Sequence, residues 1–277
     1  MALKLMYITN QPEIAKIAEN SGVDRIFIDL EYIGKSDRQG GMDTVQSHHT
    51  VDDIKKVASA ITKAELLVRI NPIHNATNEY ISSEQEIDLA IKNGAKILML
   101  PYFKKTDEVK RFISHVNKRA KTMLLLETPE AVENIDNILK TDGIDYIHIG
   151  LNDLSLGYKM KFMFELLADG TVEKLCNKFK ENKIEYGFGG IAALGKGAIP
   201  AEMVIKEHYR LGSTCAILSR SFCNTEIVTD KKEIETIFNE GMKEIRAFEE
   251  ECLKHKNFFT DNTELLKEKV QTIVNNK

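Results

Sequence analysis

Two carboxylates and one guanidinium stand at comparable places in three apolar segments. Glu127 directly follows "TMLLL", Asp153 lies in "LNDLS" just after "YIHIG", and Arg69 closes "LLVR". If the two acidic segments are neighbouring parallel strands, a hard divalent cation with oxygen ligands, Mg²⁺ or Mn²⁺, would neutralise the repulsion between Glu127 and Asp153. An always-charged, forked donor such as Arg69 suits a carboxylate or a developing enolate. Together, the three residues predict metal-assisted chemistry on a small acid.

Each of these residues also has a purely structural explanation. Glu127 would cap the helix that follows it, Asp153 would cap the next helix, and Arg69 would pair with either acid. The functional explanation depends on the shared position of the three residues at the ends of apolar segments. The fold must therefore be known to decide whether these ends lie together.

Short apolar segments with strand character alternate with stretches of helical spacing along the whole chain. There are eight such segments: "LKLMYI", "RIFIDL", "LLVRI", "KILMLPY", "TMLLLE", "YIHIG", "EYGFGG" and "CAILSR". Because near-continuous apolar strands need helices on their faces, this rhythm predicts an α/β fold, a closed (β/α)8 TIM barrel whose active site lies at the carboxyl ends of the strands. An open doubly wound sheet is the alternative, weakened by the lack of a glycine-rich nucleotide motif after the first segment.

Composition narrows the classes of partner. The chain has 277 residues, 43% of them hydrophobic, which predicts one domain over residues 1–277. A net charge of -4 offers no electrostatic footprint for nucleic acid or an anionic membrane, so a small-molecule partner is expected. We expect a cytoplasmic protein with reduced cysteines and no zinc site, because we find no secretory signal, no membrane-spanning run and no C-x-x-C pair.

The sequence around the candidate residues resembles a known family. The segments "DLE" (29–31), "VRINP" (68–72), "LLLETPEAVENI" (124–135) and "IGLNDLS" (149–155) resemble the HpcH/HpaI aldolase and citrate lyase β-subunit family. The resemblance implies a phosphoenolpyruvate/pyruvate-type barrel with Glu127 and Asp153 as metal ligands and Arg69 near a bound pyruvyl group. It also implies that Glu31 lies in the outer shell of the metal and orders its waters.

Such a site predicts a class II, metal-dependent aldolase or lyase. The enzyme would cleave or form a carbon-carbon bond next to a pyruvyl group through a metal-stabilised enolate, for example converting a 2-keto-4-hydroxy acid to pyruvate and an aldehyde. Backbone N–H groups of Gly150, Leu151 and Asn152, at the start of the following helix, would hold the substrate carboxylate. The rival chemistry, a lysine Schiff base, requires a lysine near a strand end, and none of the eight apolar segments ends on one.

The proton-transfer residue departs from the family pattern. Relatives usually carry histidine directly after the glutamate of the second-strand motif, whereas this chain has Tyr32. A longer loop follows and ends in His48 and His49, and because histidine exchanges protons near neutral pH, we expect one of the pair, with His49 preferred, to act as the base. The alternatives are that both imidazoles lie in water at a helix start, or that metal-bound water serves.

Two other functions stay open. "DLEYIGKSDRQ" also resembles the acidic segment of citrate lyase β-subunits, which would make the protein a lyase acting on a malyl or citryl thioester, although no cluster of basic residues stands out for CoA phosphates. A barrel that has lost catalysis and only binds a small acid is the third reading. The presence of Glu127, Asp153 and Arg69 argues against it.

The segments at the last two predicted strands suggest a distal anion pocket. Gly189 and Gly190 would let backbone N–H groups approach an anion, and Arg220 would supply charge, in a region where many barrels bind phosphate. Such a pocket would favour a phosphorylated or carboxylated acceptor. Alternatively, the glycines only allow a tight turn and Arg220 pairs with Glu202 or another acid at the rim.

The carboxyl-terminal tail, residues 256–277, predicts an additional helix. Its apolar residues fall on one face, which needs a partner: Leu265, Leu266, Val270, Ile273 and Val274. The family resemblance implies a homo-oligomer in which such helices pack between neighbours. The alternative is a helix folded back on its own barrel.

Overall fold

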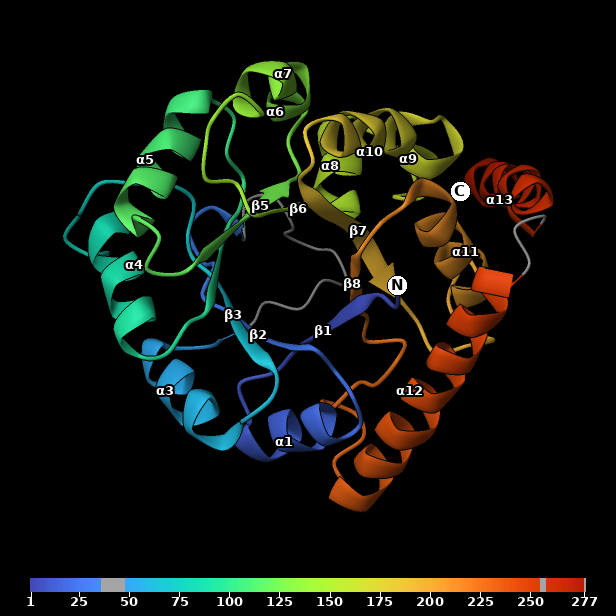
Figure 1. The fold of residues 1–277 in the computed structure, drawn as a ribbon, viewed down its shortest axis with the longest axis horizontal. Coiled ribbons are helices and arrows are strands. Elements are labelled where there is room, and N and C mark those ends of the chain that lie inside the picture. Colours follow the sequence, from blue (N-terminus) through green and yellow to red (C-terminus); the bar gives the residue numbers. More distant parts are fainter. Residues whose placement is uncertain (36–47, 255–257, 277) are drawn as a thin grey trace.

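Eight parallel strands close into a barrel in sequence order, which confirms the predicted fold (Figure 1). The structure is a computed structural model, and it describes residues 1–35, 48–254 and 258–276. The strands are β1 (Lys4–Ile8), β2 (Arg25–Asp29), β3 (Glu65–Arg69), β4 (Ile97–Leu100), β5 (Lys121–Leu126), β6 (Tyr146–Ile149), β7 (Glu185–Ile191) and β8 (Cys215–Leu218).

Helices between the strands surround the barrel (Figure 1). The helices are α1 (Pro12–Asn20), α3 (Val51–Ala60), α4 (Ser83–Lys92), α5 (Thr106–Val116), α6 (Pro129–Glu133), α7 (Ile135–Ile138), α8 (Leu151–Gly157), α9 (Glu165–Ala168), α10 (Thr171–Glu181), α11 (Ala201–Leu211), α12 (Lys231–Lys254) and α13 (Phe258–Asn275). Capping residues in the sequence determine where some of these helices begin. The hydroxyl of Thr128 accepts the N–H of Ala131, and Pro129 occupies the first turn of α6, as its sequence predicts.

The alternation of side chains along each strand explains why an apolar strand ends on a carboxylate. Met123 and Leu125 of β5 belong to the apolar cluster inside the barrel, and Glu127, two residues further on, continues this inward series at the mouth. The same rule applies to β2 and β3, whose last residues, Asp29 and Arg69, are register partners. Strand geometry therefore brings charged side chains to the carboxyl-terminal rim.

Helix α13 packs against α11 and α9 of the same chain (Figure 1). Leu266 and Val270 are buried there, whereas Leu265 is 55% exposed. The amide of Asn262 donates a 2.8 Å hydrogen bond to Glu207 of α11. The chain thus covers much of the predicted apolar face itself, which matches the alternative of a helix folded back on its own barrel, while assembly through this helix stays a prediction.

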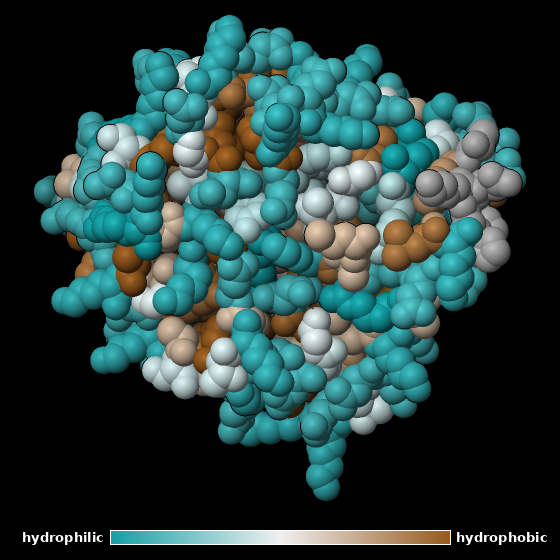
Figure 2. Space-filling view, viewed as in Figure 1, coloured by the Kyte–Doolittle hydropathy of each residue, from teal (hydrophilic) through white to brown (hydrophobic). Residues whose placement is uncertain are grey.

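The surface seen in Figure 2 is mainly hydrophilic, and hydrophobic residues show there as small, separate areas. Within the described ranges, no helix is both long enough and apolar enough to cross a lipid bilayer.

Candidate active site

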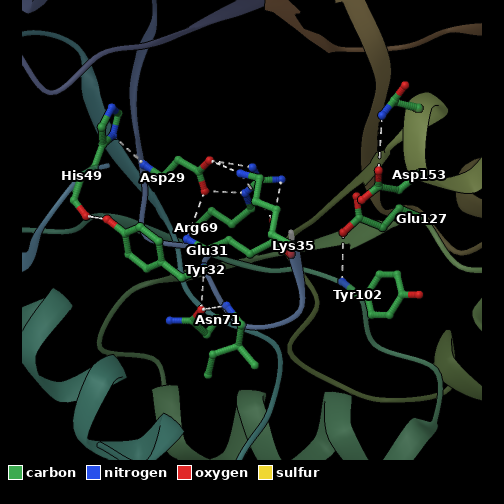
Figure 3. A network of polar contacts seen from close by, with 12 residues as sticks. Asp29, Glu31, Tyr32, Lys35, His49, Arg69, Asn71, Tyr102, Glu127 and Asp153 are labelled. Atoms are coloured by element: carbon green, nitrogen blue, oxygen red, sulfur yellow. Dashed lines mark hydrogen bonds and ion pairs between the residues drawn. The ribbon is translucent and has the colours of Figure 1, made fainter. Parts of the chain in front are cut away.

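A buried network of two carboxylates and two cations lies at the mouth of the barrel (Figure 3). The Nε and Nη2 groups of Arg69 donate to the two oxygens of Asp29 at 2.8 and 2.7 Å. Lys35 Nζ donates to Asp29 Oδ2 at 2.7 Å. Glu31 Oε2 lies 3.3 Å from Arg69 Nη1 and 3.9 Å from Lys35 Nζ. The formal charges of the four side chains balance.

The two cations keep Asp29 ionised. Burial alone would raise its pKa, but the charges and hydrogen bonds of Arg69 and Lys35 outweigh burial and hold the pKa of Asp29 well below its usual range. In the same way, Asp29 and Glu31 more than offset the effect of burial on Arg69 and raise its pKa. Asp29 therefore fixes the orientation of the guanidinium and does not exchange protons near neutral pH.

Glu127 and Asp153 line one cavity of about 230 Å³, together with Arg69. The backbone N–H of Tyr102 donates to Glu127 Oε1 at 3.0 Å, with Tyr102 in the left-handed conformation at a φ of 49°. The side-chain amide of Asn152 donates to Asp153 Oδ1 at 3.3 Å. The structure thus brings together the three residues that the sequence singles out first, and Figure 3 shows Glu127 and Asp153 apart from the Asp29 network.

The donor set of this cavity fits a hard divalent cation. Across the described ranges, no group of three or more histidine, cysteine, aspartate or glutamate side chains is arranged to hold a metal ion. A cation bound by Glu127 and Asp153 would therefore complete its coordination with substrate oxygens and water, as Mg²⁺ commonly does. Gly150 provides the space, because a Cβ there would meet Glu127 Oε2 at 2.8 Å. Gly150, Leu151 and Asn152 also line the cavity, and the predicted binding of a carboxylate by their N–H groups stays a prediction.

His49 lies in the wall of the wider cavity with one ring nitrogen engaged, and its role as the base stays a prediction. The ring is buried, and its Nδ1 accepts the backbone N–H of Asp29 at 3.0 Å. Burial lowers the pKa of His49 even though carboxylates lie nearby. Because Nδ1 accepts this hydrogen bond, the neutral ring carries its proton on Nε2. His48 is exposed and lines the same wide cavity as His49.

A wider cavity of about 630 Å³ adjoins the first and is lined by the ends of β1 and β8, by Lys35 and by both histidines. Arg69, Asn152 and Ser219 line both cavities. The predicted distal anion pocket is divided between them, because Gly189 and Gly190 line the inner cavity whereas Arg220 lines the outer one. Gly189 lies within β7 with a φ of 54° and packs against Leu151 of α8, and the distal anion pocket stays a prediction.

Sequence reasoning gave no role to several residues of the site. Asp29 has the same signal as Glu127, since both continue the inward series of a strand at its carboxyl end, and Lys35 follows Glu31 by four residues. Asn71 lies in "VRINP", and its Oδ1 accepts the N–H groups of Tyr32 and Ile33 at 2.8 and 3.0 Å. Its amide in turn donates to Glu86 of α4 at 2.8 Å, which ties the segment after β2 to the helical layer.

Comparisons with known proteins agree with this architecture. A model of the HpcH/HpaI aldolase/citrate lyase family matches residues 4–171. An HpcH/HpaI aldolase from Desulfitobacterium hafniense DCB-2 has a similar structure, with a TM-score of 0.57 and 17% identity over 79% of this chain and 86% of its own. An HpcH/HpaI aldolase/citrate lyase family protein from Burkholderia cenocepacia J2315 has a TM-score of 0.61 and 12% identity over 84% of this chain and 95% of its own. At these identities the two structures support the fold alone. A search of curated proteins found no match.

Proposed function

Because this chain belongs to the HpcH/HpaI aldolase/citrate lyase family, we propose that it is a metal-dependent aldolase acting next to a pyruvyl group. The substrate would be a 2-keto-4-hydroxy acid, which is cleaved to pyruvate and an aldehyde or formed from them. The observation that carries the proposal is the presence of Glu127, Asp153 and Arg69 in one small cavity at the carboxyl ends of the strands.

The residues around the two cavities would have different roles in the reaction. Mg²⁺ or Mn²⁺ bound by Glu127 and Asp153 would polarise the keto group and stabilise the negative charge that develops on its oxygen. Arg69 brings a second positive charge to the same cavity, and its bidentate contact with Asp29 removes the need to reorient it during the reaction. His49 offers a neutral donor at the wall of the wider cavity.

The apolar part of the inner cavity suits the carbon that reacts. Phe27, Met99 and Leu125 line it, and each is at least 96% buried, so they form a dry surface for the methyl or methylene group of the pyruvyl unit. A dry surface disfavours unproductive protonation of the carbanion by water.

The wider cavity favours a free acid or aldehyde over a CoA thioester. The described residues that line it include three arginines and lysines, Lys35, Arg69 and Arg220, and the first two pair with Asp29 and Glu31. Gripping the phosphates of CoA requires several cations. Cleavage of free 2-keto-4-hydroxy acids should therefore exceed cleavage of malyl or citryl thioesters.

Exchange of the pyruvate methyl protons in heavy water, followed by NMR, tests the proposal directly. The protein should exchange these protons with Mg²⁺ or Mn²⁺ present, and a chelator should abolish the exchange. Glu127→Gln and Asp153→Asn should each reduce it by at least about 100-fold. Glu130→Gln is the matched control, because Glu130 is exposed and pairs with Lys104. No exchange by the wild-type protein, or exchange that survives the chelator, would refute the proposed chemistry.

A further inference from the structure

His148 of β6 lines the inner cavity, and one of its ring nitrogens has an unused hydrogen-bonding capacity. The side chain is 1% exposed, and the residue is the register partner of Leu125 on β5. Its Nε2 lies 3.1 Å from the backbone carbonyl of Gly189. Its Nδ1 is buried, and no group of the described residues forms a hydrogen bond with it. A buried polar atom without a partner is costly, so this nitrogen invites a ligand group.

The contact with Gly189 determines which form of the ring is present. A backbone carbonyl can only accept a hydrogen bond, so the proton of the neutral ring is on Nε2 and Nδ1 carries a lone pair. Burial, together with the positive charges of Arg25 and Arg69, outweighs the bond to Gly189 and lowers the pKa of His148 to about 4. The ring is therefore neutral at pH 7, and its Nδ1 is a hydrogen-bond acceptor.

The backbone of the neighbouring strand holds the ring in this state. The pairing of β7 with β8 shifts between Gly187 and Gly190, and Gly189 has a φ of 54°, a left-handed conformation that glycine adopts readily. A Cβ at position 189 would meet Leu151 Cδ1 at 2.7 Å, so the strand has little freedom to change there. The carbonyl that engages Nε2 thus belongs to a fixed part of the barrel, and Nδ1 stays the acceptor.

The place of His148 shows which part of a ligand can reach it. Leu125, its register partner, belongs to the apolar surface that suits the reacting carbon. Asn152 and Ser219 line both cavities, whereas His148 lines only the inner one of the two. A ligand group that bonds to Nδ1 is therefore part of the pyruvyl half. Because the carboxylate and keto oxygens of that half only accept, the donor must be a substituent on carbon 3.

We propose that His148 selects a pyruvyl unit with a hydroxyl group on carbon 3, as in hydroxypyruvate, an inference that rests on the proposed aldolase function. The hydroxyl group donates a hydrogen bond to Nδ1, and no proton is transferred. A site built to bond a hydroxyl group discriminates against the analogue without it, because the buried acceptor then stays unpaired. The aldol products of such a unit are 3,4-dihydroxy-2-keto acids.

Hydroxypyruvate and 2-ketobutyrate test this selection, because they carry a hydroxyl and a methyl group of similar size on carbon 3. Metal-dependent exchange of the carbon 3 protons in heavy water, corrected for exchange without protein, gives kcat/KM for each compound. His148→Phe removes the acceptor and should lower the ratio of hydroxypyruvate to 2-ketobutyrate about tenfold relative to the wild-type protein. Exchange of 2-ketobutyrate should stay within about threefold, since it makes no bond to Nδ1.

Tyr146→Phe is the matched control. Tyr146 lies two residues earlier in β6, is 5% exposed and belongs to the cluster inside the barrel, but it does not line the inner cavity. This variant should leave the ratio unchanged. An unchanged ratio in His148→Phe, or an equal loss of exchange with both compounds, would overturn the proposal. If the wild-type protein exchanges no pyruvate protons, it is the proposed aldolase function that fails.

A binding measurement decides the role of His148 without turnover. In wild-type protein labelled with ¹⁵N-histidine, the NMR signal of His148 Nδ1 should shift when hydroxypyruvate and Mg²⁺ saturate the site. It should keep its position with 2-ketobutyrate and Mg²⁺, because only hydroxypyruvate brings a donor. The same shift with both compounds, or with neither, would refute the proposal. The measurement uses the wild-type protein and therefore stands even if His148→Phe does not fold.

Discussion

Replacement of Asp29 by asparagine tests whether the network at the mouth is a structural element of the barrel. Asp29 is 1% exposed and contacts Arg69 through both oxygens and Lys35 through one. Asp29→Asn keeps the shape of the side chain and one acceptor oxygen. It removes the charge and leaves two buried cations facing Glu31 alone.

Removal of one partner from a buried ion pair costs about 3–5 kcal/mol. Because the asparagine oxygen can still accept one hydrogen bond from Arg69, we expect Asp29→Asn to lower the free energy of unfolding by about 3 kcal/mol at pH 7. The pKa of Asp29 is lowered in the folded protein, so its stabilisation is complete above the unfolded value of about 4 and is lost as the pH falls toward the folded value. The difference between wild type and variant should therefore be constant from pH 8 to about pH 5 and shrink below about pH 4.

Urea unfolding followed by circular dichroism at several pH values measures both quantities. Asp88→Asn is the matched control, because Asp88 pairs with Arg119 at 2.8 Å on the surface with 51% of its side chain exposed. That variant should lose less than about 1 kcal/mol. Equal stability of wild type and Asp29→Asn at pH 7, or a difference that widens on acidification, would refute the reasoning.

Three further predictions concern the cavities and the tail. Gly150→Ala should weaken Mn²⁺ binding by at least about tenfold in calorimetry, because its Cβ would lie 2.8 Å from Glu127 Oε2, and unchanged affinity would count against the metal site. Arg220→Ala should raise the KM for an anionic acceptor about tenfold while leaving pyruvate exchange intact, and equal damage to both would contradict a distal role. Deletion of residues 260–277 should reduce the mass measured by light scattering, and an unchanged assembly would argue against oligomerisation through the tail.

The fold was predictable because its signals are local and repeated. Each apolar segment and the helix after it can be read without knowledge of distant contacts, and eight such repeats leave few topologies. The residues at the strand ends were predictable for the same reason. Every second side chain of a strand points into the barrel, and Glu127 and Arg69 fall on these positions at the carboxyl ends.

The rest of the site was not predictable, because it depends on contacts between residues far apart in the sequence. His49 reaches the N–H of Asp29 from the far end of a loop, and nothing in "SHHT" shows which ring nitrogen would be occupied. Likewise, the sequence does not show that Gly189, within β7, lines the inner cavity while Arg220, after β8, lines the outer one. Residues of suitable type were found, but their protonation and grouping required the structure.

The positions of Tyr32 and Lys35 after β2 can be understood together. Tyr32 uses its hydroxyl to hold the backbone of His49, and its N–H to reach Asn71, so it serves as an anchor of the segment that follows β2. With that segment held on both sides, the chain returns Lys35 to Asp29 at the end of the same strand. A histidine at position 32 could exchange a proton directly, but it lacks the length and the phenolic hydroxyl that make this anchor. A Tyr32→Phe substitution removes the hydrogen bond to His49 and should therefore lower the free energy of unfolding by about 1 kcal/mol, the net value of one hydrogen bond, as measured by urea unfolding, and unchanged stability would contradict this anchor.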